Sequence, residues 1–287
     1  LTFTTSYVSK VSFIISLLEA TPKATATPTK FFFKIFYLCF SFEMNINFNN
    51  KTIVVTGAGQ GIGNELCKRL YNNGAKVYAF SRSKGPLDEL KLECPNITTV
   101  TVDLGNWNDT IEALKILDGI EVDGLVNNAA IAIIKPFLEL TESDFDDQFN
   151  INFKAVFNVT QQVVPLLKTG SSIVNVSSLA SLIGIDGHSV YSATKAALDS
   201  FTQSLSLELG PRKIRVNSVN PTVILTKMGR ANWSDPAKSE PLLNRIPLRR
   251  FGEVSEVVDA IVYFLSEKSS FPIDSSCFLQ HSNRKFR

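Results

Sequence analysis

The chain has 287 residues, of which 44% are hydrophobic, so it is long and apolar enough for one large domain with a substantial core. Its 29 basic and 27 acidic residues nearly cancel, and no dense run of Lys or Arg occurs, which argues against a nucleic-acid partner. The four cysteines form no CxxC spacing and only two histidines are present, so we expect no metal site. Reduced cysteines are typical of intracellular proteins, and we expect a cytoplasmic location.

Residues 1–43 differ in composition from the rest of the chain. The sequence starts with Leu1, and its first methionine is Met44. Two runs, VSFIISLL and FFFKIFYLCFSF, are apolar, but neither reaches the roughly 20 apolar residues needed to cross a bilayer, so we expect no stable membrane span. The segment is rich in Ser, Thr and Lys and loosely resembles a transit peptide, which leaves an organellar address as the minor alternative. We interpret 1–43 as a non-core leader ahead of a native start at Met44.

From residue 51 onward, short β-branched runs alternate with amphipathic segments. The expected strands are 51–57, 75–81, 97–103, 122–130, 171–178 and 213–221, and the expected helices are 64–74, 86–93, 107–117, 141–149, 152–168, 189–209 and 253–267. Apolar runs without strict alternation indicate strands that are buried on both faces. Repeated strand-helix units with right-handed crossovers form a parallel sheet between two layers of helices. We therefore predict an α/β fold with a Rossmann-like doubly wound parallel sheet in a single domain.

A glycine-rich turn, TGAGQGIG (56–63), follows the first expected strand and precedes the first expected helix. Missing side chains let the backbone approach a pyrophosphate, and the helix N-terminus offers free N–H groups and the positive end of the helix dipole. The alternative is an ordinary glycine-rich turn, but this position in the fold favours a dinucleotide. The candidate cofactor contacts here are Gly57, Gln60, Gly61, Ile62 and Gly63.

The end of the second expected strand bears on the choice between NAD and NADP. An acidic residue there would bind the ribose hydroxyls of NAD, but this strand ends with Ser81 and Arg82. Arg82 can hold a 2′-phosphate by charge-assisted hydrogen bonds, so we predict NADP(H); the alternative is a solvated loop arginine. Asp103 and Leu104, after the third strand, are expected beside the adenine, with a helix cap as the alternative role for Asp103.

Five motifs occur in order, TGAGQGIG, NNAA (127–130), IVNVSS (173–178), YSATK (191–195) and NPTVILT (220–226). Together they resemble the short-chain dehydrogenases/reductases over about 48–266, and longer stretches around them are similar to the dicarbonyl/L-xylulose reductases within that family. The resemblance implies an NADPH-dependent carbonyl reductase, a homotetramer, that acts on small α-dicarbonyls and reduces L-xylulose to xylitol. A reductase of another ketone, such as a 3-oxoacyl thioester, and a catalytically weak dinucleotide-binding scaffold are the alternatives.

A tyrosine and a lysine stand one helical turn apart, at Tyr191 and Lys195. Tyr191 is the expected general acid that protonates the carbonyl oxygen. The pKa of a free phenol is about 10, and a nearby ammonium lowers it, so Lys195 is expected to tune Tyr191. The resemblance assigns Ser178 to the substrate oxygen, with Ser177 as its rival, and also gives Lys195 a contact with the nicotinamide ribose.

The resemblance also assigns an asparagine at the start of a helix to a water that relays protons. Asn152 matches it, with Asn150 as the weaker candidate and a helix cap as the alternative role. The expected cofactor contacts elsewhere in the motifs are Asn128, Tyr191, Lys195, Val223 and Thr226.

For the substrate pocket we select His188 and Trp233, in addition to Ser178 and Tyr191. A polar loop histidine and a packing tryptophan are their alternative roles.

The C-terminal end departs from the family pattern. Relatives finish with a Thr-Gly, a last strand and a Gly-Gly turn, whereas here LSEKSS runs into FPIDSSCFLQHSNRKFR. We therefore divide the chain into a leader (1–43), a reductase domain (44–270) and an atypical tail (271–287). SSCFLQ is a candidate strand, but loss of the family's last strand would expose an apolar sheet edge and argues against the tetramer.

Overall fold

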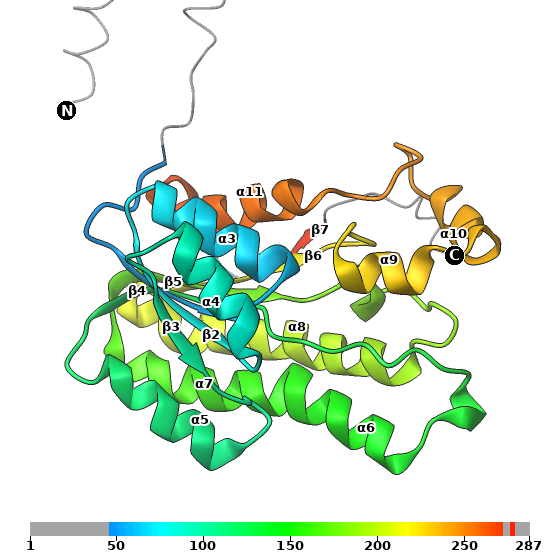
Figure 1. Ribbon diagram of the computed structural model, residues 1–287, viewed down its shortest axis with the longest axis horizontal. Helices are drawn as coiled ribbons and strands as arrows, with labels where there is room; N and C mark the ends of the chain where they lie inside the picture. The colour runs from blue at the N-terminus through cyan, green and yellow to red at the C-terminus, as the bar shows by residue number, and fades with distance from the viewer. Residues whose placement is uncertain (1–45, 272–275, 279–287) are drawn as a thin grey trace, which may run out of the picture. The chain divides into compact units, whose positions relative to one another are not determined.

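The computed structural model describes residues 46–271 and 276–278, and contains one sheet of seven parallel strands in the order β3-β2-β1-β4-β5-β6-β7 (Figure 1). The strands are β1 (Thr52–Thr56), β2 (Lys76–Ser81), β3 (Thr98–Thr101), β4 (Val122–Asn127), β5 (Leu167–Val176), β6 (Arg215–Asn220) and β7 (Ser276–Phe278). The strand order reverses between β1 and β4, which creates the crevice where ligands bind in doubly wound folds. The predicted fold class is confirmed.

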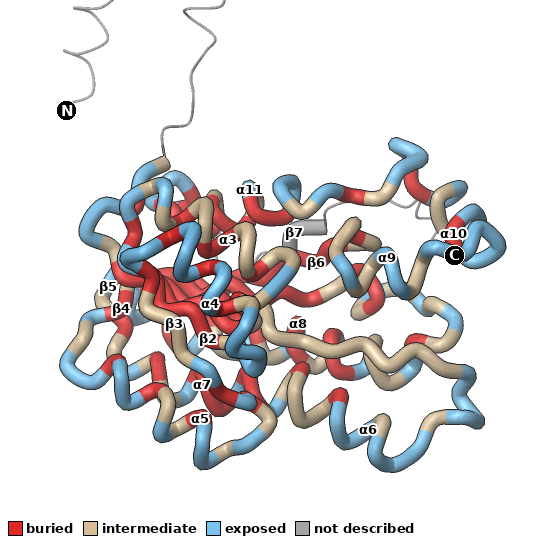
Figure 2. Tube along the Cα trace, viewed as in Figure 1, coloured by how far each residue is buried: buried red, intermediate tan, exposed pale blue. Residues whose placement is uncertain are grey.

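Helices cover both faces of the sheet because the central strands are apolar on both faces (Figure 2). In β1, Ile53 and Val55 pack into one core, and Val54 packs into the other. The first core is closed by α3 (Gly61–Asn72), α4 (Lys84–Glu93) and α11 (Val254–Leu265). The second is closed by α5 (Trp107–Leu114), α7 (Ala155–Val163) and α8 (Ser189–Leu209). All six were expected as helices, and α8 has the predicted bounds.

The segment around Asn152 differs from the prediction of two separate helices. Helix α6 (Glu142–Phe149) continues through a π-helical turn, Asn150–Lys154, directly into α7. Asn152 is therefore inside a continuous helix, and neither starts nor caps one. The following strand β5 begins at Leu167, four residues before the predicted start, because the 3₁₀ turn Val164–Leu166 ends the helix early.

Two short helices that were not predicted follow β6: α9 (Lys227–Trp233) and α10 (Pro236–Leu243). We call this pair the lid. Helix α9 has no buried residue, and α10 has only Ser239. Because neither helix buries an apolar face, neither was indicated by a helical apolar pattern in the sequence.

A seventh strand, β7, lies beyond the predicted end of the domain at residue 270. It falls within the candidate segment SSCFLQ and pairs in parallel with β6, Val219 opposite Cys277. This pairing covers the edge of β6 that loss of the family's last strand was expected to expose. The predicted leader 1–43 and tail residues 279–287 lie outside the described residues. Within the described ranges, no helix is both long and apolar enough to cross a membrane.

Candidate active site

The glycine-rich turn forms a tight cradle at the N-terminus of α3. Gly57 and Gly61 adopt the left-handed backbone, with φ of 68° and 57°. A Cβ atom on Gly57 would lie 2.8 Å from Ala129 Cα, and one on Gly63 would lie 2.3 Å from Gly57 O. Only glycine fits at these positions. Gln60, at the N-cap of α3, makes no capping bond with its side chain, so the first N–H groups of the helix remain available to an anion.

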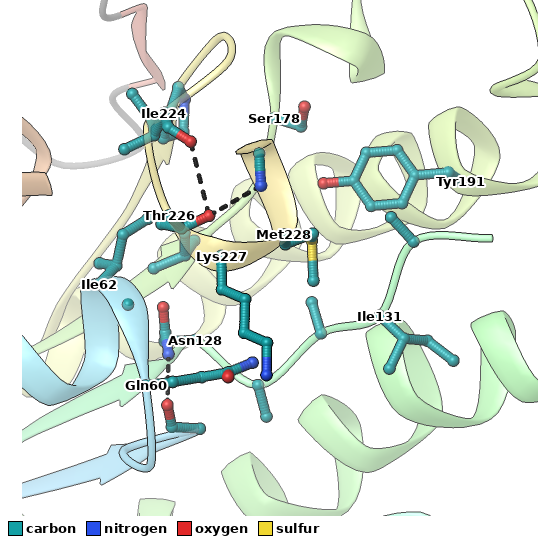
Figure 3. Close-up of a pocket in the computed structure, with 18 of the residues that line it drawn as sticks. Gln60, Ile62, Asn128, Ile131, Ser178, Tyr191, Ile224, Thr226, Lys227 and Met228 are labelled. Atoms are coloured by element: carbon teal, nitrogen blue, oxygen red, sulfur yellow. Dashed lines mark hydrogen bonds between the residues drawn. The ribbon is translucent and has the colours of Figure 1, made fainter. Parts of the chain in front are cut away.

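Asn128 holds this cradle to the neighbouring strand. Its Nδ2 donates to Thr56 O and Gly57 O, at 3.0 and 3.1 Å (Figure 3). Thr56 Oγ1 accepts from the N–H groups of Asn128 and Ala129, at 3.0 and 3.2 Å. The bonds to Thr56 O and Gly57 O occupy the Asn128 Nδ2, and Asn128 also lines the cavity, so its contact with a cofactor stays a prediction. Thr56 was missed, because its position next to the glycines does not indicate what its hydroxyl binds.

One cavity of about 700 Å³ runs from this cradle to the N-terminal end of α8. Most residues that the sequence assigned to a cofactor line it: Gly57, Gln60, Gly61, Ile62, Arg82, Asp103, Leu104, Asn128, Tyr191, Lys195, Val223 and Thr226. Gly63 and Asn152 do not line the cavity but lie behind it, Gly63 against the loop and Asn152 against Ile131. The volume and the glycine cradle fit a dinucleotide.

At the β2 end of the cavity, the side chains that line the wall are Ser81, Arg82 and Ser83. Arg82 is exposed. Asp103 Oδ1 accepts from Gly105 N–H at 2.9 Å, and the N-cap of α5 is Asn106. The alternative role of Asp103 as a helix cap is therefore wrong, and its carboxylate supports the β3–α5 turn at the cavity wall.

At the α8 end, Tyr191 points its hydroxyl into the cavity (Figure 3). A hydrogen bond from Ser178 lowers the pKa of Tyr191, but burial has the larger effect and raises it. Lys195 Nζ lies 5.9 Å from the centre of the Tyr191 ring and donates to Val176 O at 2.8 Å. Burial and Ser178 are the causes of the Tyr191 pKa shift, so the predicted lowering of that pKa by Lys195 is not seen.

Lys195 itself is almost fully buried, and burial lowers its pKa to about 8, although Asp199 raises it. Asp199 follows one helical turn later and is also buried. Its Oδ2 accepts from Asn220 Nδ2 at 2.8 Å, and the same Nδ2 donates to Ser178 O at 3.3 Å. These contacts join the lysine-bearing helix to the loop that carries Ser178, and nothing in the sequence spacing indicated them.

The side chains of Ser177 and Asn150, the alternatives to Ser178 and Asn152, bind backbone carbonyls. Ser177 Oγ donates to Lys195 O at 3.2 Å, so it faces the backbone of α8. Asn150 Nδ2 donates to Gly105 O at 3.0 Å, on the β3–α5 turn.

The Asn152 amide binds both the N–H and the C=O of Ile131, at 2.8 and 2.9 Å, and donates to Thr194 Oγ1. The π-helical turn, a feature often found at functional sites, places this amide between α8 and the loop after β4.

The two substrate-pocket candidates are brought together. The ring centres of His188 and Trp233 are 5.9 Å apart, and those of His188 and Tyr191 are 6.0 Å apart. His188 Nδ1 lies 2.7 Å from Asp186 O, so Nδ1 is the donor and a neutral ring offers Nε2 as an acceptor. Burial lowers the His188 pKa, which favours that neutral form. His188 is therefore not a solvated loop residue.

The loop after β6 completes the cavity and begins the lid. Leu225 N–H donates to Gly252 O at 2.9 Å, and Gly252 N–H donates to Val223 O at 3.1 Å. Thr226 Oγ1 caps α9 by accepting from Gly229 N–H at 3.1 Å. A Cβ on Gly61 would be 3.1 Å from Thr226 Cγ2, so this threonine lies directly over the glycine cradle.

Comparisons with known proteins agree with this geometry. The model of the short chain dehydrogenase family matches residues 51–237. L-xylulose reductase from Bos taurus is 49% identical over 236 residues, which are 81% of this chain and 96% of the relative. Carbonyl reductase (NADPH) 2 from Sus scrofa is 48% identical, over 82% of this chain and 97% of the relative.

Solved structures show the same fold. A short chain dehydrogenase from Burkholderia cenocepacia, in complex with NADP, is 27% identical and has a TM-score of 0.76, over 81% of this chain and 97% of its own. A glucose/ribitol dehydrogenase from Brucella melitensis is 31% identical, with a TM-score of 0.77, over 82% and 96% of the two chains. The chain therefore belongs to the short-chain dehydrogenases/reductases, a family of oxidoreductases that act on alcohol and carbonyl groups.

Proposed function

We propose that this chain is an NADPH-dependent carbonyl reductase that acts on small α-dicarbonyls and on L-xylulose, which it reduces to xylitol. The observation that carries the proposal is the meeting of Ser178, Tyr191 and His188 at one end of a cavity whose other end is the glycine cradle. High identity to relatives named L-xylulose reductase supports the substrate class.

The chain's own residues supply the proton and the polar contacts. Bound NADPH supplies the hydride. Tyr191 is placed as the general acid because its hydroxyl points into the cavity that Ser178 also lines (Figure 3), although burial raises its pKa. The Ser178 hydroxyl, hydrogen-bonded to Tyr191, is placed to hold the same carbonyl oxygen and stabilise the charge that develops on it. Lys195 would hold the nicotinamide ribose of bound NADPH, and Asn152 would support the proton relay through its contact with the loop at Ile131.

The cofactor preference rests on charge at the β2 end of the cavity. The exposed Arg82 fits a 2′-phosphate, and no acidic side chain from β2 lines this wall. A relative named carbonyl reductase (NADPH) 2 and a structural relative in complex with NADP support this choice.

The substrate end suits a small polar carbonyl compound. His188 Nε2 offers an acceptor for a hydroxyl, and the Trp233 ring closes the pocket from the lid. The homotetramer implied by the family stays a prediction.

The test measures oxidation of NADPH and NADH by the full chain with diacetyl and with L-xylulose. We expect turnover of both substrates with NADPH and much slower turnover with NADH. A folded chain that turns over neither substrate with either cofactor would refute the carbonyl reductase. Equal use of the two cofactors would instead refute the role of Arg82, and the variant Arg82→Ala should bring the two rates together.

A further inference from the structure

The lysine that begins the lid lines the cofactor cavity and has no assigned role. Lys227 follows Thr226, which lies over Gly61, and its side chain points toward Gln60 in the glycine cradle (Figure 3). Within 46–271 and 276–278, no carboxylate forms an ion pair with it. An exposed ammonium therefore faces the N-terminal end of α3.

The backbone fixes where this side chain starts. Thr226 N–H donates to Ile224 O at 2.7 Å, and Thr226 Oγ1 accepts from Gly229 N–H at 3.1 Å. A Cβ on Gly229 would lie 2.0 Å from Ile224 O, so this turn is closed to any larger residue. Although α9 is short and exposed, its first residue is thus held against the cradle.

The charged side chains that line the cavity lie at separate positions along it. Among the residues that the structure describes, the charged side chains that line it are Arg82, Lys195, Lys227 and one carboxylate, Asp103. Arg82 is at the β2 end, and Lys195 is buried beside Tyr191. The remaining cation, Lys227, lies near the helix N-terminus where a dinucleotide's pyrophosphate binds in this fold.

We propose that Lys227 binds the pyrophosphate of the cofactor and so acts as a latch between the cofactor and the lid. This inference rests on the proposed function. The same short helix that starts with Lys227 ends with Trp233, which contacts His188 at the substrate end. Cofactor binding then keeps α9 against the cradle and stabilises the contact of Trp233 with His188 at the substrate end.

The test measures the dissociation constants of NADPH, NADH, ADP-ribose and 2′-AMP with the full chain and with Lys227→Met. We expect about a tenfold weaker affinity for the three ligands that contain a pyrophosphate, because a charge-assisted contact is lost. The affinity for 2′-AMP should not change. Lys227→Arg should retain most of the affinity, and Arg230→Met is the matched control, since it removes an exposed cation from the same helix outside the cavity.

The outcomes distinguish the two levels of the proposal. A wild-type chain that binds neither NADPH nor NADH refutes the proposed function and the latch together. Wild-type binding with equal affinity in Lys227→Met refutes only the latch. A loss confined to NADPH and 2′-AMP would place Lys227 on the 2′-phosphate and overturn the pyrophosphate assignment.

Discussion

The two walls of the cavity are built in different ways. The cradle wall, formed by the turn 57–63 and Asn128, is tied to buried strands by a network of backbone and side-chain hydrogen bonds. The lid wall, formed by α9 and α10, has almost no buried residue and is anchored mainly at its start, through Val223 and Gly252. A rigid wall suits a large cofactor that must bind in the same position in every turnover, whereas a weakly packed wall can move to admit a substrate.

The largest expected effect is on turnover, at Tyr191 of α8, which lines the cavity between the two walls. Tyr191→Phe should lower kcat by about 10²–10⁴-fold, since it removes the hydroxyl that we propose as the general acid. The affinity for NADPH should remain. The check is steady-state turnover together with fluorescence titration of NADPH. Appreciable residual turnover would contradict the acid role.

The next effect concerns Lys195, the buried lysine at the α8 end of the cavity. Its pKa falls from 10.5 to about 8 in the folded chain, which corresponds to about 3 kcal/mol against the charged form. Below pH 8 the folded state must carry this buried ammonium, so Lys195→Met should be inactive but more stable by roughly that amount. As the pH rises from 8 toward 10.5, the unfolded chain binds more protons than the folded one and the wild type gains stability.

Chemical unfolding at several pH values checks this prediction. The difference in the free energy of unfolding between Lys195→Met and wild type should shrink as the pH rises. Lys154→Met, at an exposed position, serves as the control. A stability difference that does not change with pH would show that burial of the charge is not its cause.

A smaller effect tests the rigidity of the cradle wall. Gly63→Ala should weaken NADPH binding and lower the free energy of unfolding by about 1–3 kcal/mol, because the added methyl would overlap Gly57 O. Gly85→Ala is the matched control, since a Cβ there meets no atom within 4 Å. Thermal melting and NADPH titration check the pair. Equal stability and equal NADPH affinity of the two variants would show that the cradle accommodates an added methyl group as easily as the surface position does.

The smallest effect is expected on the lid wall. Trp233→Ala should raise KM for L-xylulose about tenfold, because it removes the ring that closes the substrate end of the cavity beside His188, and about 1.4 kcal/mol of lost substrate contact is a tenfold loss of affinity. Stability and NADPH affinity should change little, since α9 has no buried residue. Kinetics with L-xylulose and diacetyl check this prediction. A large loss of stability instead would show that the lid is as firmly packed as the cradle.

The amino-acid sequence by itself determined the fold class and the place of each motif. Strands such as β1 and the long helix α8 are read from local apolar patterns, and parallel strands necessarily bring their carboxyl ends to one edge. Gly57, Arg82 and Ser178 each follow a strand, and Tyr191 lies in the first turn of α8, so their gathering at one cavity could be predicted.

Only the tertiary structure decided which atoms meet. The pairing of β7 with β6, the π-helical turn at Asn152 and the Asp199–Asn220 contact all join segments that are distant in sequence or differ from regular helices. The pKa values of Tyr191 and Lys195 likewise depend on burial, which no spacing of residues reveals. Local patterns specify elements because they involve neighbours along the chain, whereas hydrogen-bond partners and desolvation depend on packing in three dimensions.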